Sequence, residues 1–162
     1  MTGQAPQNSR SRPLYTPEQR KRRDRTQWTL VQGVLAPLQF AVFLISLALV
    51  IRYMVTGDGL WIATVSIVVK TALLYTIMVT GAIWEKVVFG QYLLAPAFFW
   101  EDVFSFFVIA LHTAYLWALF SGQPIETQMW IALAAYGAYV INAAQFLLKL
   151  RAARLDAQAV PA

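Results

Sequence analysis

Four long apolar runs limit what this 162-residue chain can fold into. The runs cover residues 31–51, 59–84, 103–123 and 127–148. Each has the roughly 20 residues that a helix needs to cross about 30 Å of hydrocarbon. Lys70 and His112 are the only basic or acidic side chains inside them. The sequence therefore predicts an all-α membrane protein with four transmembrane helices.

Tryptophans mark the ends of these spans. All six fall at or near the end of an apolar run, where indole rings concentrate at the membrane–water interface. They are Trp28, Trp61, Trp84, Trp100, Trp117 and Trp130. The end of the fourth run is marked instead by Lys149, Arg151 and Arg154. The spans are predicted at about residues 30–54, 60–84, 100–121 and 127–149.

The basic residues are distributed unevenly along the chain. Of the 13 Lys and Arg residues, 11 lie in the two terminal segments or in the segment between the second and third runs, and the two short turns carry none. By the positive-inside rule, both termini are expected in the cytoplasm. The short turns predict antiparallel neighbours in an up-down-up-down bundle. Because 59% of the residues are hydrophobic, the expected partner of this basic chain is the lipid bilayer and not a nucleic acid.

The segments outside the spans are short. Residues 1–14 are polar and rich in Gln, Pro, Ser and Arg, and we expect a disordered tail. Thr16 and Pro17 predict the start of a short N-terminal amphipathic helix at the membrane interface. One transmembrane domain is expected over residues 15–155, with a C-terminal tail at residues 156–162. The absence of cysteine excludes disulfides, thiolate metal sites and cysteine nucleophiles.

The connection between the second and third runs, residues 84–102, is unlike an ordinary loop. It is apolar and aromatic, yet it carries Lys86 and three of the eight carboxylates, Glu85, Glu101 and Asp102. This composition suits a segment at a membrane surface whose carboxylates lie at the mouth of an interior site. An acidic helix start favoured by the helix dipole accounts for Glu101 or Asp102, but not for Glu85. We therefore predict that chemistry takes place at this segment.

Polar side chains within the spans indicate a polar interior. Ionisable groups inside a span are costly and need a partner or a function. Lys70 and His112 are predicted at a similar depth, roughly 18–21 Å from the cytoplasmic tryptophans, and helical periodicity puts Glu101 and His112 on one face. His112 fits either a ligand or a simple hydrogen bond to a carbonyl oxygen. Asn142 and Gln145 are assigned to the binding site, with hydrogen bonds between helices as the alternative.

Short motifs in a fixed order run through nearly the whole chain. They are LYTPEQRKRRDRTQW, VLAPLQF, SIVVKT, WEKVVFG, LAPAFFWEDVF, ALHTAYL and NAAQFLLKLRAARL. In their order and spacing, over about residues 14–155, the chain resembles the 3-vinyl bacteriochlorophyllide hydratases of phototrophic bacteria, also called chlorophyllide a hydratases. The resemblance implies that water adds across the C3-vinyl group of chlorophyllide a or vinyl bacteriochlorophyllide, both magnesium chlorins. The product carries a 1-hydroxyethyl group and belongs to bacteriochlorophyll a biosynthesis.

The implied reaction can be assigned to residues already named. An acid must protonate the vinyl group and a base must activate water, and carboxylates with different protonation states suit both roles. The three carboxylates of residues 84–102 are the predicted catalytic residues. His112 is expected to ligate the substrate magnesium or to relay a proton, Lys70 to pair with a keto or propionate oxygen, and Lys86 with the propionate. No cofactor is expected beyond the magnesium of the substrate.

The expected location is the intracytoplasmic photosynthetic membrane. The pigment, the lipid bilayer and other pigment-biosynthesis enzymes are the expected partners. Two other functions remain open at this point. His112 and the aromatic content also fit a non-catalytic pigment-binding or assembly subunit. Lys70 and His112 in mid-span also fit a small proton-coupled carrier, although four helices are few for a transporter and no internal repeat is present.

Overall fold

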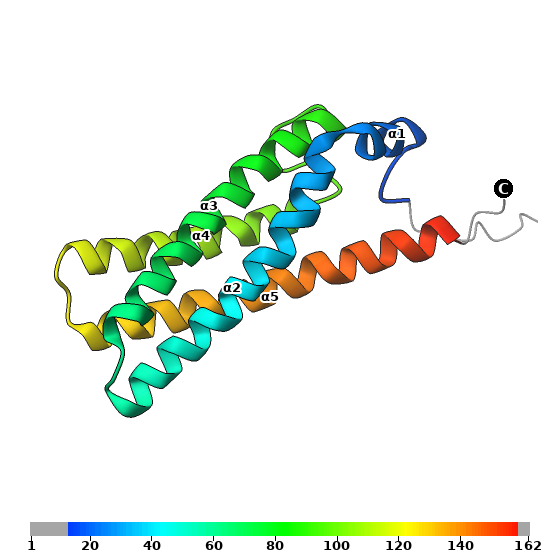
Figure 1. The fold of residues 1–162 in the computed structure, drawn as a ribbon. Helices are drawn as coiled ribbons and strands as arrows, with labels where there is room; N and C mark the ends of the chain where they lie inside the picture. Colours follow the sequence, from blue (N-terminus) through cyan, green and yellow to red (C-terminus); the bar gives the residue numbers. More distant parts are fainter. Residues whose placement is uncertain (1–12, 159–162) are drawn as a thin grey trace, which may run out of the picture.

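The computed structural model describes residues 13–158, which form five helices and the turns between them (Figure 1). The helices are α1 (Pro17–Arg25), α2 (Gln27–Thr56), α3 (Leu60–Phe89), α4 (Phe99–Phe120) and α5 (Ile125–Gln158). The last four are long and apolar enough to cross a membrane, and they run alternately up and down. The predicted all-α architecture with four transmembrane helices is confirmed.

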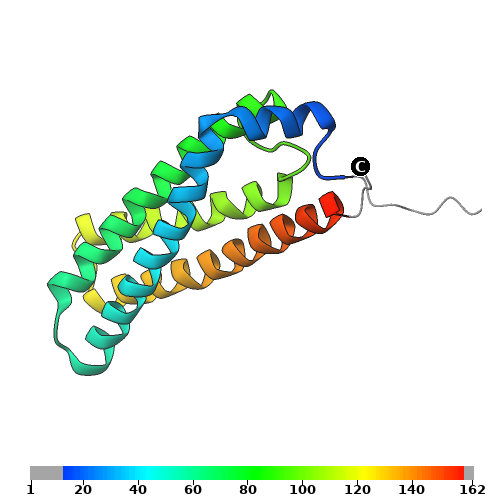
Figure 2. The ribbon, with the colours of Figure 1, turned by 45° about the vertical axis from the view of Figure 1, so that its right-hand side comes forward.

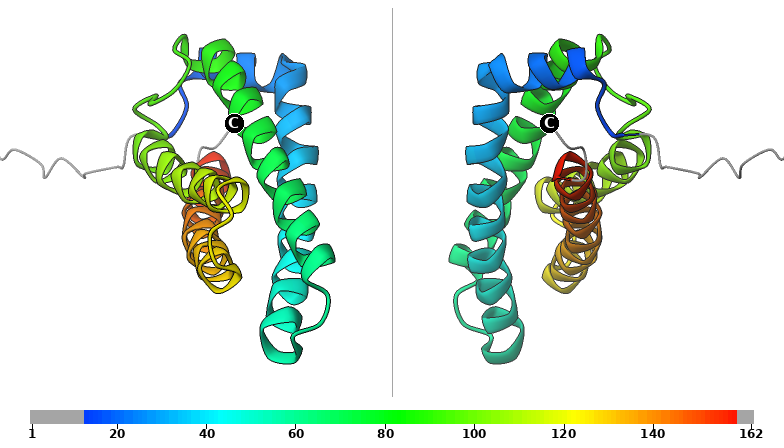
Figure 3. Two further views of the ribbon diagram at one scale, coloured as in Figure 1. Left: turned by 90° about the vertical axis from the view of Figure 1, so that its left-hand side faces the viewer. Right: turned by 90° about the vertical axis from the view of Figure 1, so that its right-hand side faces the viewer.

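The four long helices form two hairpins, α2 with α3 and α4 with α5 (Figure 3). The helices pack extensively within each hairpin, whereas the two hairpins contact each other much less. One such contact joins α2 to α5, where Phe43 packs against the rings of Tyr136 and Tyr139. Ser46 of α2 also shares a hydrogen bond with the Tyr136 hydroxyl. The interior between the hairpins is therefore partly polar.

The loop between α3 and α4 is shorter than predicted. It covers only residues 90–98, whereas the sequence indicated one connection over residues 84–102. Gly90 ends α3 in the left-handed conformation, with φ 90°, and the Lys86 ammonium donates to the Gly90 carbonyl oxygen at 2.8 Å. The flanking carboxylates therefore lie within helices, Glu85 near the end of α3 and Asp102 in the first turn of α4.

The N-terminal segment covers one end of the bundle, which we call the terminal end because both described chain ends lie there (Figures 1 and 2). Tyr15 is buried, and its ring stacks on Phe89 at 5.8 Å between centroids. The Arg23 guanidinium lies 4.8 Å from the Tyr15 ring centroid. Burial raises the pKa of the Tyr15 phenol, so the guanidinium faces a neutral ring. Since α1 carries no large apolar side chain, it is held by Tyr15 and by the hydrogen bond that the Thr29 hydroxyl donates to the Arg23 carbonyl oxygen.

The short N-terminal helix starts where the sequence predicted it. The Thr16 hydroxyl accepts from the Gln19 N–H, and the Gln19 side chain accepts from the Thr16 N–H. Most of the expected disordered tail, residues 1–12, lies outside the described residues, as do residues 159–162 of the expected C-terminal tail. Between these limits α5 stays helical to Gln158, past its predicted end at 149, because this part of the chain is rich in good helix formers.

Candidate active site

Two buried carboxyl groups, one from each hairpin, meet at the terminal end of the bundle. Glu85 lies near the end of α3 and Asp102 in the first turn of α4, and their exposed fractions are only 5% and 3%. The two carboxyl groups are within hydrogen-bonding reach of each other. Because a carboxylate offers only acceptors, a hydrogen bond between the two forms only when one of them carries a proton. The pair can therefore supply an acid and a base at one place.

The main chain of the loop holds this carboxyl pair. The Leu94 N–H donates to Asp102 Oδ2 at 2.7 Å, and the Ala95 N–H donates to Glu85 Oε2 at 3.2 Å. Leu94 is left-handed, with φ 59°, which costs a residue with a β-carbon about 1–2 kcal/mol. Successive N–H groups that point to one side form an anion-binding arrangement. The loop thus fixes one oxygen of each carboxyl group.

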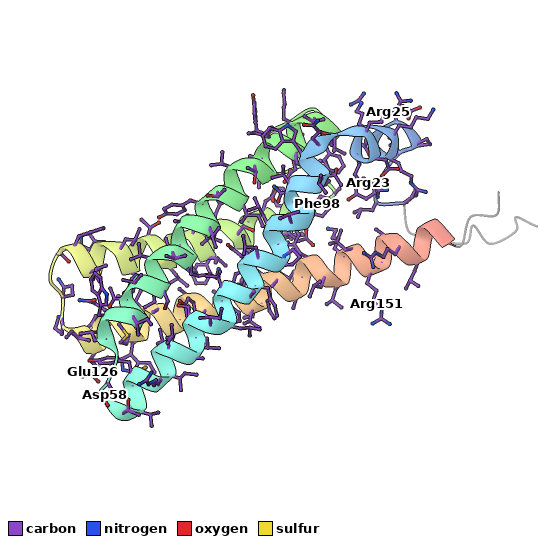
Figure 4. All side chains as sticks on the ribbon, viewed as in Figure 1. Arg23, Arg25, Asp58, Phe98, Glu126 and Arg151 are labelled. Carbon is purple, nitrogen blue, oxygen red and sulfur yellow. The ribbon has the colours of Figure 1, made fainter. Side chains whose placement is uncertain are left out.

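Phe98 is the centre of an aromatic cluster beneath the N-terminal segment. Its ring contacts those of Trp84, Phe89 and Tyr15, and it stacks on Phe146 of α5. Figure 4 shows Phe98 between the two hairpins at the terminal end. The cluster joins both hairpins and the N-terminal segment to the loop that holds the carboxyl pair.

Glu101, the third predicted carboxylate, has a different partner. Its Oε2 accepts from Lys149 Nζ of α5 at 3.0 Å. Both side chains are mostly buried, and the ion pair joins the two helices of the second hairpin. The structure therefore brings Asp102, and not Glu101, against Glu85.

A polar stripe runs along α5. Its members follow one another at spacings of three or four residues and are Tyr136, Tyr139, Asn142, Gln145 and Lys149. The Asn142 amide donates to the Ser105 hydroxyl at 2.8 Å, and that hydroxyl donates to the Glu101 carbonyl oxygen. Sequence reasoning missed Lys149 as a site residue because it was taken as the mark of a span end. Its helical spacing from the two predicted amides was the available signal.

A second polar cluster lies in the middle of the bundle. Lys70 and His112 are both fully buried, and the His112 ring lies 6.0 Å from that of Tyr136 of α5, measured between centroids. Lys70 Nζ lies 3.6 Å from the centroid of the Tyr139 ring. His112 Nδ1 lies 2.8 Å from the Val108 carbonyl oxygen. Since that oxygen can only accept, Nδ1 carries the proton and the free lone pair of the neutral imidazole is on Nε2.

Several polar atoms in the bundle interior have no hydrogen-bond partner. Among the described residues these buried atoms are Gln39 Oε1, Lys70 Nζ, His112 Nε2, Tyr115 OH, Asn142 Oδ1 and Gln145 Oε1. Buried polar groups in proteins are nearly always hydrogen-bonded. Here unpartnered atoms come from all four long helices, which indicates an interior built to hold a polar ligand or water.

The two polar clusters lie at different depths. Asp102 and His112 are ten residues apart on α4, a rise of about 15 Å. Asn142 and Gln145 lie between the two levels on α5. Lys86 joins neither cluster, because its side chain is exposed, caps α3 and lies over the Tyr92 ring. Of the predicted site residues, only Lys86 lies away from the interior.

Fold and site together define a multi-pass membrane protein with a buried pair of carboxyl groups and a polar interior between two helical hairpins. The chain belongs to the 2-vinyl bacteriochlorophyllide hydratase family, whose model matches residues 15–152. A protein of this name from Cereibacter sphaeroides is 76% identical over 148 residues, which cover 91% of this chain and 92% of that protein. Another, from Rhodobacter capsulatus, is 72% identical over 153 residues, covering 94% and 90%. No solved structure matches this chain significantly.

Proposed function

We propose that this chain adds water to the C3-vinyl group of chlorophyllide a or vinyl bacteriochlorophyllide and forms the 3-(1-hydroxyethyl) derivative. The identity to proteins named 2-vinyl bacteriochlorophyllide hydratase supports this reaction. The observation that carries the site is the buried pair of Glu85 and Asp102, held by two loop N–H groups. The product is a secondary alcohol, which a separate dehydrogenase can oxidise to a ketone.

The carboxyl pair has the groups that vinyl hydration requires. Its protonated member delivers a proton to the terminal vinyl carbon, and the positive charge that forms on the inner carbon spreads over the conjugated macrocycle. Its ionised member accepts a proton from water as the water oxygen bonds to the inner carbon. The pair ends with one proton, as it began, and the substrate has gained one water molecule.

The macrocycle is proposed to bind in the interior between the hairpins. His112 Nε2, which has a free lone pair, is the proposed axial ligand of the substrate magnesium. The amides of Asn142 and Gln145 are available to polar groups at the rim of the macrocycle. No organic cofactor takes part in this proposal. Lys86 stays a prediction, as a contact for a propionate that extends out of the bundle.

The direct test is conversion of chlorophyllide a by membranes that contain the full-length protein. The expected product is heavier by one water molecule, and its red absorption band is shifted to the blue because a conjugated double bond is lost. Membranes without the protein are the control. Well-folded protein that retains pigment stoichiometrically and gives no product would replace this proposal with a non-catalytic pigment-binding subunit.

His112→Ala is expected to weaken the binding of chlorophyllide a at least about tenfold, or ~1.4 kcal/mol. The reason is loss of the proposed magnesium ligand from the interior. Binding of the metal-free pigment should change little, because it makes no such bond. Absorption titrations with both pigments measure this difference, and added imidazole should restore part of the loss for the magnesium form alone. Equal weakening for both pigments would remove the ligand role.

Both termini are proposed to lie in the cytoplasm, in an intracytoplasmic photosynthetic membrane, with other pigment-biosynthesis enzymes as neighbours. The support is the basic terminal end, where Figure 4 labels Arg23, Arg25 and Arg151, opposite an end with Asp58 and Glu126. Because the chain has no cysteine, single-cysteine variants report topology cleanly. Asp58→Cys should react with a membrane-impermeant maleimide in intact cells, and Gln91→Cys only after permeabilisation. The reverse pattern would invert the orientation.

A further inference from the structure

Lys70 is a fully buried ammonium group in the middle of α3. Its Nζ has no hydrogen-bond partner, and neither ion pair found within residues 13–158 involves it. It faces the ring of Tyr139 on the opposite hairpin, 3.6 Å from the ring centroid. Since an ammonium has three donors, N–H groups remain free for another acceptor.

Packing does not explain a lysine at this position. An unpaired charge in a membrane interior is strongly unfavourable, and an apolar side chain of similar length would fill the same space. The cation–π contact with Tyr139 offsets only part of this cost. Gln39, one turn from the Phe43 that packs on Tyr139, and His112 also carry unpartnered acceptor atoms. Each of the four long helices thus supplies one group, an arrangement typical of a binding site.

We propose that Lys70 donates a hydrogen bond to a ring keto oxygen of the magnesium chlorin. The inference rests on the proposed function and extends it to the orientation of the substrate. Lysine offers only donors and therefore needs an acceptor, which a keto oxygen supplies, whereas His112 Nε2 offers a lone pair and fits a metal. A magnesium macrocycle with a conjugated keto group satisfies both groups at once, and the Tyr139 ring suits a flat ligand.

This contact sets which edge of the macrocycle lies deepest in the bundle. The vinyl group and the ring keto group are on opposite sides of a chlorin. If the keto edge is held at Lys70, the vinyl edge is directed away from it, toward the terminal end where Glu85 and Asp102 meet. Lys70 is therefore a positioning residue, and its loss should affect binding and orientation before it affects proton transfer.

The resonance Raman spectrum of chlorophyllide a bound to the full-length protein in nanodiscs tests the proposal. The keto stretching band should be lower in frequency than for pigment in a solvent without donors. In Lys70→Met it should return to the free value, and the dissociation constant should rise about tenfold to a hundredfold, as for hydrogen bonds to charged groups. Lys70→Arg, which keeps its donors, should retain a lowered band. Lys21→Met, at an exposed lysine of α1, is the matched control and should match wild type.

Two modified pigments show whether Lys70 donates to the ring keto oxygen or to the propionate. Chlorophyllide with its ring keto group reduced should bind to wild type and Lys70→Met with similar affinity, while the methyl ester of the propionate should keep the full difference. An unchanged keto band in Lys70→Met, or a difference abolished by the methyl ester, would overturn the proposal. If the proposed hydration were wrong but the Lys70 contact right, the keto band would still depend on Lys70 and no hydration product would form. Circular dichroism checks that Lys70→Met folds, which an apolar replacement of a buried charge should allow.

Discussion

Glu85→Gln is expected to lower the rate of vinyl hydration by about 10²–10⁴-fold, the range typical for loss of a positioned acid or base. The glutamine side chain can still accept from the Ala95 N–H, so the loop and the pigment site should remain intact. What is lost is the exchange of one proton between two carboxyl groups. Asp102→Asn should have the same effect, because it removes the other half of the pair. Initial rates with chlorophyllide a, together with its dissociation constant, measure the two consequences separately.

Glu101→Gln is the matched control for this prediction. It makes the same chemical change at the neighbouring carboxylate, which pairs with Lys149 and not with Glu85. Its rate should fall far less than that of Glu85→Gln, and the main loss should be in stability, since a mostly buried ion pair is broken. A rate loss as large as that of Glu85→Gln would show that the reactive pair has been wrongly chosen.

Phe98→Ala is expected to lower the free energy of unfolding by about 3–5 kcal/mol, the usual cost of removing a buried aromatic ring. Only 3% of Phe98 is exposed, and its ring joins α3, α5 and the N-terminal segment. Unfolding in mixed micelles with increasing SDS measures the change. Activity should fall as well, because the same loop carries the Leu94 and Ala95 N–H groups that hold the carboxyl pair.

Phe99→Ala provides the comparison for Phe98→Ala at the next position. Phe99 is 41% exposed and lies outside the cluster around Phe98, so its removal should cost much less. Equal loss of stability in the two variants would mean that the aromatic cluster does not support the terminal end of the bundle.

The fold was predictable to the extent that it depends on local properties. Run length, lack of charge and tryptophan position are local, and they were sufficient for four spans and their alternating direction. The loop at residues 90–98 begins where Gly90 ends α3 in the left-handed conformation and ends where α4 begins at Phe99. Composition alone described residues 84–102 as one segment and did not locate these two helix ends.

The sequence predicted which residues form the candidate site, but not which of their side chains face one another. Glu101 and Asp102 are neighbours about 100° apart on a helix, so the docking of α4 decides which of them faces Glu85. Helical periodicity placed Glu101 on the same face as His112, and this alignment gave no information about α3. The left-handed conformation of Leu94 could not be predicted either, because Gly and Asn are the residues that usually signal it.

The division of the carboxyl pair between the two hairpins bears on how the protein is made. A hairpin of two apolar helices satisfies its own backbone hydrogen bonds, and we expect each to insert into the bilayer as a separate unit during synthesis. The first inserted hairpin holds Glu85 without Asp102, and only later docking of α4 and α5 completes the pair. A nascent or truncated chain should therefore be inert toward pigment, and activity should appear together with assembly of the second hairpin.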